Sequence, residues 1–400
     1  MLKSKKARFV LQMLWRVMFL ALFLIGFNAW VAWHLLEWLN VQSVHADFSS
    51  MIWSTFLISF TYLYGRIIRK PKWIQLPLIW VGSYLFVVFE WVIVATLLFH
   101  AFYWPLKWIG LLEWAPHFIE VYGWISMSLI VIGLVWGSYQ AWSPVVRSYQ
   151  VKIRKKALDG RKKLKIVMFS DLHVGRIVGR KHIRRLIELT KSLNPELILI
   201  AGDVLDDAVE PFLEKDIDQM LGELKAPHGV FAILGNHEYF GGGIPRYVQA
   251  MHEQGIQVLL DDVICIDGIG YLVGRKDRTA EMVFRGDPIG RRSLKEMIQE
   301  IDPQMMTSCP VILMDHQPYG LQHAASCGVD IVVCGHTHRG QVFPNHWITA
   351  KIFELDWGYR MFDQLHAIVS SGYGTWGPPV RIGSRSEIVQ MDVEFEIEMK

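Results

Sequence analysis

The chain has 400 residues, of which 52% are hydrophobic and 20% charged, and its formal net charge is +3 at pH 7. This length and apolar content exclude a disordered chain, and only four cysteines exclude a small disulfide-stapled scaffold. The averages conceal two different halves, because fourteen of the 17 tryptophans but only five acidic residues precede residue 145.

The first half contains four long apolar segments that are typical of membrane-spanning helices. A helix needs about 20 apolar residues to cross about 30 Å of hydrocarbon. These segments lack the polar face that buried helices of soluble proteins show at a period of 3.6 residues, and Trp and Tyr gather near their ends. We expect a transmembrane region over residues 1–145, with helices at about 17–39, 48–68, 76–100 and 119–143.

Basic residues are distributed unevenly among the loops of this region. Five Lys or Arg precede the first span, the next three loops hold none, four and one, and nine lie between residues 147 and 165. Because basic loops stay on the cytoplasmic side, we expect a multi-pass protein of the cell membrane with a cytoplasmic N-terminus and a cytoplasmic second half. The lipid bilayer is thus an expected partner.

Residues 146–163 are predicted to be a basic juxtamembrane linker. Such a run is an ordinary flank of a membrane span, and it could also contact anionic lipid headgroups. We expect no nucleic-acid partner, because no aromatic-interleaved binding motif accompanies the basic residues.

The second half alternates short apolar runs with amphipathic stretches, which predicts an α/β domain over residues 164–400. One amphipathic stretch, residues 182–193, has helical spacing, and residues 263–273 and 388–397 alternate like hairpin strands. Five runs are short and rich in Ile, Val and Leu, as buried strands are: 164–169, 197–201, 230–234, 311–314 and 331–334.

Polar residues of one kind follow each of these five buried strands. Because ligands of α/β folds bind outside the carboxyl ends of the strands, we expect these side chains to face one crevice. The five segments are Asp171-Leu172-His173, Gly202-Asp203-Val204-Leu205-Asp206, Gly235-Asn236-His237-Glu238, Asp315-His316 and Gly335-His336-Thr337-His338.

Imidazole together with carboxylate suits zinc, iron or manganese better than magnesium. The candidate ligands are too many for one tetrahedral ion, and they suit two divalent ions that share a carboxylate. Paired ions of this kind support phosphoryl displacement. The seven candidate ligands are Asp171, His173, Asp203, Asn236, His316, His336 and His338.

In these five segments the sequence resembles the calcineurin-like metallophosphoesterase superfamily. The pattern of that family is Asp-x-His, Gly-Asp-x-x-Asp, Gly-Asn-His-Asp/Glu, a separate His and Gly-His-x-His, and every element is present. The resemblance covers about residue 163 to the C-terminus, and it implies a four-layer α/β/β/α sandwich. The membrane half lies outside it.

The resemblance also implies a role for each matching residue. One ion would be held by Asp171, His173, Asp203 and His338. The other would be held by Asp203, Asn236, His316 and His336, so that Asp203 bridges the two. His237 would act on the leaving group as a general acid or hydrogen-bond donor, with Glu238 orienting it and Asp206 supporting the ligands from behind.

Two further stretches are candidates for substrate binding. Tyr239 begins a glycine-rich loop, and Arg381 and Arg385 follow the predicted strand 366–370. Arginine could hold a phosphate group there through two hydrogen bonds. A plain turn and a packed loop with solvated arginines are the alternatives.

We therefore expect a membrane-anchored phosphoesterase that hydrolyses a phosphoester or pyrophosphate by direct attack of metal-bound hydroxide. Tethering to the bilayer makes a lipid or another membrane-associated phosphorylated compound the first substrate class. The alternative is a membrane receptor or scaffold whose metal domain binds a phosphorylated ligand without turnover. A transport path that includes Glu90 is a third possibility.

Overall fold

The computed structural model describes residues 2–68, 70–111, 115–281 and 290–395, although several side chains before residue 24 lie outside the described set. The chain divides into two compact units, Met1–Val135 and Trp136–Lys400. This division falls about ten residues before the boundary expected at residue 145.

The first unit is helical. Its elements are α1 (Leu2–Val41), α2 (Phe48–Ser59), α3 (Thr61–Ile67), α4 (Lys72–Trp108) and most of α5 (Ala115–Trp142). Two helices of the described residues, Lys72–Trp108 and Pro116–Trp142, are long and apolar enough to cross a membrane. The second predicted span, expected as one helix, is instead two short helices that meet at Phe60.

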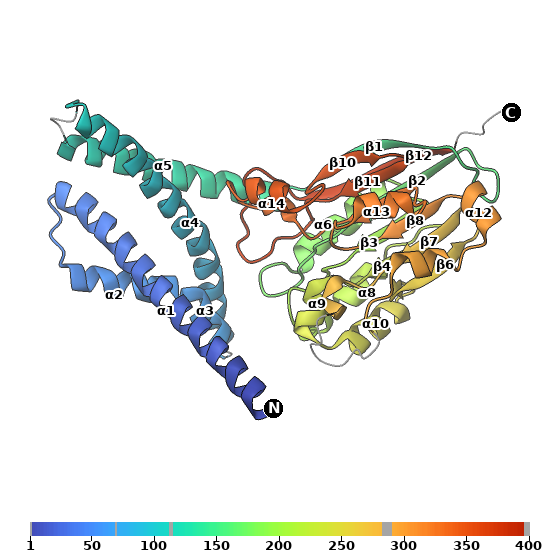
Figure 1. Cartoon of the computed structure of the whole chain (residues 1–400), viewed down its shortest axis with the longest axis horizontal. Coiled ribbons are helices and arrows are strands. Elements are labelled where there is room, and N and C mark those ends of the chain that lie inside the picture. Colours follow the sequence, from blue (N-terminus) through green and yellow to red (C-terminus); the bar gives the residue numbers. More distant parts are fainter. Residues whose placement is uncertain (1, 69, 112–114, 282–289, 396–400) are drawn as a thin grey trace. The chain divides into compact units, whose positions relative to one another are not determined.

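The second unit contains two six-stranded mixed sheets (Figure 1). The first sheet has the strand order β1-β12-β2-β3-β4-β5 and the second β10-β11-β9-β8-β7-β6. The first consists of β1 (Val145–Ile153), β2 (Lys163–Phe169), β3 (Leu197–Ala201), β4 (Val230–Ile233), β5 (Gln257–Leu259) and β12 (Glu387–Phe395). The second consists of β6 (Asp262–Ile266), β7 (Gly270–Gly274), β8 (Val311–Met314), β9 (Ile331–Cys334), β10 (Gly358–Phe362) and β11 (Leu365–Val369).

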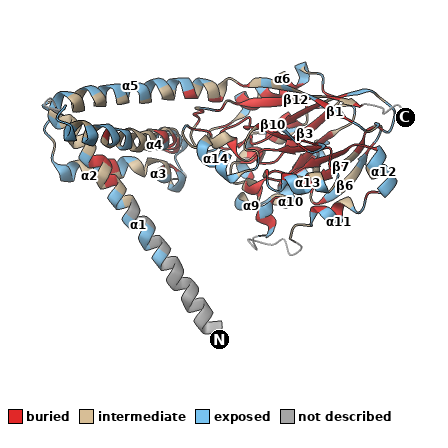
Figure 2. Ribbon diagram, turned by 45° about the horizontal axis from the view of Figure 1, so that its top comes forward, coloured by how far each residue is buried: buried red, intermediate tan, exposed pale blue. Residues whose placement is uncertain are grey.

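Three clusters of buried apolar side chains arrange these sheets and helices in layers. One cluster lies between the first sheet and the helices α6 (Arg180–Ser192), α8 (Ile217–Leu221) and α10 (Ile244–Glu253). A second joins the facing sides of the two sheets. A third lies between the second sheet and the helices α11 (Leu294–Ile298) and α13 (Leu321–Ser326). The central strands are therefore buried on both faces, as Figure 2 shows, which explains their unbroken apolar sequences.

The segment 146–163, which was expected to be a basic linker, begins as a strand of the first sheet. Residues Val145–Ile153 form β1, which pairs in parallel with β12 along the edge of the first sheet. Exposed side chains such as Lys152 alternate with buried or half-buried ones such as Val151 and Ile153. Because Arg147 lies on the half-buried side and Val146 on the exposed side, the period of two was hidden in the sequence.

The last turns of α5 belong to the second unit and are bonded to the loop that precedes β12. The Arg381 amide donates to the Gly137 carbonyl at 2.9 Å, and the Ser386 hydroxyl donates to the Ala141 carbonyl at 2.6 Å. The apolar helix therefore ends inside the α/β unit as one of its packed elements.

Candidate metal centre

The candidate ligands leave the strands through unusual backbone conformations. Asp171, His173 and Asp203 have φ between 45° and 54°, and His336 and His338 have φ of 73° and 49°. L-residues rarely adopt this left-handed region, and each costs of order 1 kcal/mol or more. Strained backbone at five candidate ligands indicates that the surrounding fold fixes the positions of these side chains, as a functional site requires.

The structure brings three of the predicted ligands of the first ion together. Asp171, His173 and His338 offer ligand atoms that lie within 4.8 Å of one another. The Nε2 atoms of His173 and His338 are 2.9 Å apart, and Nε2 of His338 is 3.6 Å from Oδ1 of Asp171. All three side chains are buried.

The predicted ligands of the second ion form a neighbouring group. Asp203, His316 and His336 also have ligand atoms within 4.8 Å of one another. Asn236 joins them, because its Oδ1 lies 2.8 Å from Nδ1 of His336. The backbone amide of His336 donates to both carboxylate oxygens of Asp171, so the two groups are also linked directly.

Asp203 lies between the two groups, as a bridging carboxylate would. Its Oδ2 is 3.0 Å from Nε2 of His316 and 3.9 Å from Nε2 of His173. Nδ1 of His173 is buried without a hydrogen bond among the described residues, and Nε2 of His316 lies against the Asp203 carboxylate. Since buried polar atoms are normally paired, these nitrogens and the shared carboxylate fit the donor set of two cations. The site also contains a third possible ligand group, which is formed by His173, Asp203 and His237.

The electrostatics of the pocket suit cation binding. Burial holds the pKa values of His173 and His338 well below the ordinary value, and burial together with His316 lowers the pKa of His336 to about 4. These imidazoles are thus neutral near pH 7, which is the form that binds a metal.

The pKa values of the two acidic ligands shift in opposite directions. Burial raises the pKa of Asp171 to about 6. Burial also acts to raise the pKa of Asp203, but the neighbouring His316 outweighs it and holds that pKa below its ordinary value. Burial would lower the pKa of His316, yet the Asp203 carboxylate raises it well above the usual range. A divalent cation would replace the proton between these two side chains.

Glu238 supports the backbone around Asp203, which differs from its predicted role of orienting His237. Its carboxylate accepts hydrogen bonds from the amides of Asp203 at 3.1 Å, Leu205 at 2.8 Å and Gly235 at 2.7 Å. The sequence could not distinguish the two roles, because the direction of the Glu238 side chain depends on how the first turn of α9 (Asn236–Gly241) packs.

His237 is positioned through its other contacts. Its Nδ1 contacts the carbonyl oxygen of Asp206, and its backbone amide donates to Oδ1 of Asp203 at 2.9 Å. Its ring centre is 4.7 Å from that of His173. Burial opposes protonation, but the Asp203 charge and the Asp206 contact raise the pKa of His237. Asp206 therefore supports His237, and its Oδ1 also lies 3.9 Å from Nδ1 of His173.

The structure does not place Arg381 where a substrate could reach it, which corrects the prediction for this residue. Arg381 is fully buried and donates to the carbonyls of Ser371, Gly372 and Gly374. Its Nη2 also lies 3.1 Å from Nδ1 of His338, so it positions a candidate ligand from behind. Burial lowers its pKa to about 10, so it remains charged.

The other two predicted substrate residues are also engaged within the fold. Arg385 donates to the carbonyl and hydroxyl oxygens of Ser143 at 2.8 and 2.9 Å. Tyr239 packs half-buried against the cluster beneath the first sheet. The sequence pattern placed these residues in loops near the site but could not indicate that their side chains point into the protein.

Two exposed aromatic residues near His237 lie in the two stretches that the sequence offered for substrate binding, although neither was itself predicted to contact substrate. The ring centre of Phe240 lies 5.9 Å from that of His237, and the ring centre of Trp376 lies 6.2 Å from it. Their side chains are 58% and 60% exposed. Gln341 holds the loop of Trp376 by hydrogen bonds to the backbone of residues 376 and 378. The signal available in the sequence was the isolated aromatic residue in a polar, glycine-rich loop.

Comparisons with known proteins agree with this geometry. Residues 164–340 match the family model described as calcineurin-like phosphoesterase. A Danio rerio transmembrane protein with metallophosphoesterase domain is 30% identical over 67% of this chain and 60% of its own length. An uncharacterized metallophosphoesterase of Helicobacter pylori strain J99 is 30% identical over 67% of this chain and 69% of its own length. Among solved structures, a dimetal phosphatase from Danio rerio is similar, with 10% identity, a TM-score of 0.35, and coverage of 59% of this chain and 100% of that one.

The chain thus belongs to the calcineurin-like metallophosphoesterases. Its matched region spans 60% of the length of the zebrafish relative. Family membership confirms the α/β metallophosphoesterase class predicted from the five motifs.

We expect Arg381→Lys to lower the stability of the second unit and to weaken metal binding. The single ammonium group of lysine cannot serve all the carbonyls that the three guanidinium nitrogens serve, and each buried acceptor left unpaired costs about 1–3 kcal/mol. The unfolding midpoint and the metal content per chain of the purified protein measure both effects. Arg385→Lys, which alters contacts to Ser143 and the Tyr139 ring and none to a candidate ligand that the structure describes, is the control and should retain its metal. A raised KM with unchanged stability and metal content would instead support the substrate-binding role.

Proposed function

We propose that the chain is a membrane-anchored phosphoesterase that uses two divalent ions held by the Asp171 and Asp203 groups. The observation that carries this proposal is the position of Asp203 between two groups of buried imidazoles and carboxylates. When bound, manganese, zinc or iron would supply a Lewis acid and an activated water for attack on phosphorus.

The residues of the chain would supply binding, orientation and a proton. Asp171, His173 and His338 would hold one ion, and Asn236, His316 and His336 the other, with Asp203 shared. His237 would hold a proton for the leaving oxygen. Its contact with the Asp206 carbonyl fixes Nδ1 as the donor there, which leaves Nε2 as the nitrogen that can give a proton to the substrate.

Changing His237 to alanine tests this role. Loss of a positioned general acid should reduce kcat by about 10²–10⁴-fold, whereas the bound metal should stay near two ions per chain, because His237 is not among the proposed ligands. Hydrolysis of a soluble aryl phosphodiester in manganese buffer and metal analysis measure the two quantities.

Loss of both metals in His237→Ala would contradict the role and favour His237 as a ligand. A wild-type protein that binds metal and a phosphorylated ligand without hydrolysing any ester would favour the receptor or scaffold alternative.

We propose an amphiphilic phosphoester or pyrophosphate as the substrate class. Trp376 and Phe240 expose apolar rings beside His237. Helix α14 (His346–Ile352) exposes Trp347 and Ile348. This helix follows Gln341, whose carbonyl accepts from the Ile382 amide in the loop bonded to the end of α5. Exposed aromatic and aliphatic side chains near a membrane helix suit contact with lipid.

Trp376→Ala should separate amphiphilic from soluble substrates. Removing an apolar contact of tryptophan size should lower kcat/KM for a lipid-linked phosphoester by about tenfold or more. A soluble phosphodiester without an apolar chain should be hydrolysed at the wild-type rate. Met361→Ala, at a position 48% exposed on β10, is the matched control. Equal losses for both substrates would contradict the amphiphile assignment.

We also propose four membrane spans with both the N-terminus and the catalytic unit in the cytoplasm. Two sufficiently long apolar helices and the basic-residue counts of 5, 0, 4, 1 and 9 support this arrangement. A cysteine introduced at Ser43 should react with a membrane-impermeant thiol reagent in intact cells, whereas one at Lys152 should react only after permeabilisation. The reverse pattern would invert the topology.

A further inference from the structure

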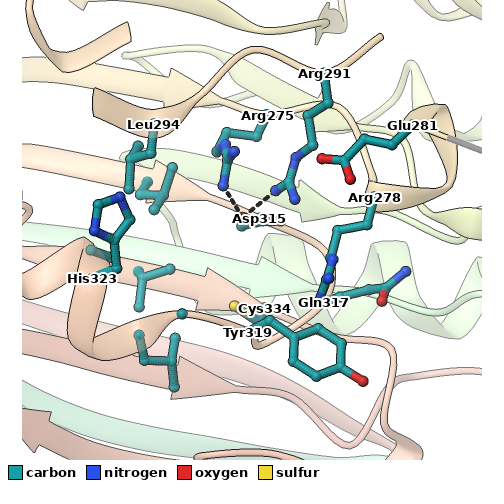
Figure 3. A pocket seen from close by; sticks show the side chains of 15 residues that line it. Arg275, Arg278, Glu281, Arg291, Leu294, Asp315, Gln317, Tyr319, His323 and Cys334 are labelled. Atoms are coloured by element: carbon teal, nitrogen blue, oxygen red, sulfur yellow. Dashed lines mark hydrogen bonds and ion pairs between the residues drawn. The ribbon is translucent and has the colours of Figure 1, made fainter. Parts of the chain in front are cut away.

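A polar cavity lies beside Asp315, the residue that directly precedes the candidate ligand His316. It encloses about 320 Å³ between the end of β7, the turn η1 (Arg278–Glu281), Arg291 and α13. Figure 3 shows Asp315 at its centre, with arginine side chains approaching from two sides. The floor is apolar and consists of Leu294, Leu313, Ala324, Val332 and Cys334.

One carboxylate serves two arginines in this cavity. Oδ2 of Asp315 accepts from Nη1 of Arg275 at 2.9 Å and also from Nη2 of Arg291. The side chains of Arg275, Arg291 and Asp315 are only 13%, 5% and 6% exposed. Asp315 therefore points away from the candidate ligands, although its neighbour His316 is one of them.

Several polar atoms of this cluster have no protein partner. Within the described ranges, Nε of Arg275, Nε of Arg291 and Oδ1 of Asp315 are buried without a hydrogen bond. Buried guanidinium and carboxylate groups normally satisfy their hydrogen bonds. These two donors and one acceptor beside a cavity indicate a ligand that offers both acceptor oxygens and a donor O–H.

The charges of the lining point to an anion. Three guanidinium groups, those of Arg275, Arg278 and Arg291, stand against the two carboxylates of Asp315 and Glu281. Glu281 is exposed, and Figure 3 shows its carboxylate directed toward Arg291. The groups that line the cavity therefore carry a net positive charge, which suits an oxyanion, and the buried carboxylates of Asp261 and Asp277 act on Arg275 and Asp315 from outside the lining.

We propose that this cavity binds a phosphate-class oxyanion. The planar arginine donors match phosphate oxygens, and a protonated phosphate oxygen could donate to the free Oδ1 of Asp315. Arg278 would complete the site from its mouth, where its guanidinium lies over the Tyr319 ring at 4.4 Å.

The cavity is connected to the metal centre through aromatic contacts. The ring centre of Tyr319 is 4.8 Å from that of Phe353, which is 5.9 Å from that of His336. The oxyanion could therefore come from two sources: free phosphate, or a second phosphoryl group of the compound that is being hydrolysed. Both sources present the same chemistry to the arginines.

Phosphate protection of Arg278 from phenylglyoxal tests the binding itself, without any need for turnover. The full-length, metal-loaded protein is labelled in sodium phosphate and in sodium chloride of equal ionic strength, and each arginine is quantified by mass spectrometry. Arg360 is an internal control, because it is also exposed and lies over the Phe362 ring at 4.9 Å.

We expect phosphate at about ten times its dissociation constant to slow modification of Arg278 by about tenfold, with no change at Arg360. Equal modification of both arginines in the two buffers, or equal slowing at both, would overturn the proposal whether or not the enzyme turns over.

A kinetic comparison distinguishes the two sources. Arg278→Gln and the control Arg360→Gln are assayed with a soluble diester that has one phosphate and with one that has a second, distal phosphate. A KM raised about tenfold for Arg278→Gln with the second compound alone assigns the site to the substrate, because a charge-assisted contact is worth about that much. Unchanged KM values for both compounds, with Arg278 protected in the wild type, assign the site to free phosphate.

Discussion

The arrangement of the catalytic unit depends on one constraint, which is that side chains from two separate sheets must meet at a single carboxylate. Asp203 follows β3 in the first sheet, and His316 follows β8 in the second, yet their side chains approach to 3.0 Å. The apolar cluster between the sheets fixes the strand ends that make this approach possible. The left-handed turns at the ligands are the local cost of aiming the side chains inward.

Buried groups that are not ligands hold these turns in place. Glu238 accepts hydrogen bonds from three backbone amides around Asp203. Arg381 donates to carbonyls of the loop of residues 371–374 and contacts His338. Such polar groups are stable in the interior because nearly all of their hydrogen bonds are made. Since both act on the backbone around the ligands, their influence on catalysis would come through the position of the metals and not through contact with substrate.

Much of the fold and of the ligand set could be predicted from the sequence, because the buried central strands and the residues that follow them have a local signal. Unbroken runs such as 197–201 identify strands buried on both faces, and an Asp or His directly after such a run lies at the carboxyl edge of a sheet. What could not be predicted is the direction of long side chains in loops. Arg381 in a glycine-rich loop suggests a residue that binds phosphate. The direction of its side chain, however, depends on how the loop packs against the end of α5, and this packing has no local signal in the sequence.

In the structure we propose, Asp203 joins two metal sites into one dinuclear centre. The electron paramagnetic resonance spectrum of the full-length protein loaded with two manganese ions per chain tests it most directly. Because a bridging carboxylate couples the spins of neighbouring ions, the account predicts the many-line spectrum of an exchange-coupled pair, and loss of that coupling in Asp203→Asn. The six-line spectrum of isolated manganese ions in the wild-type protein would contradict it.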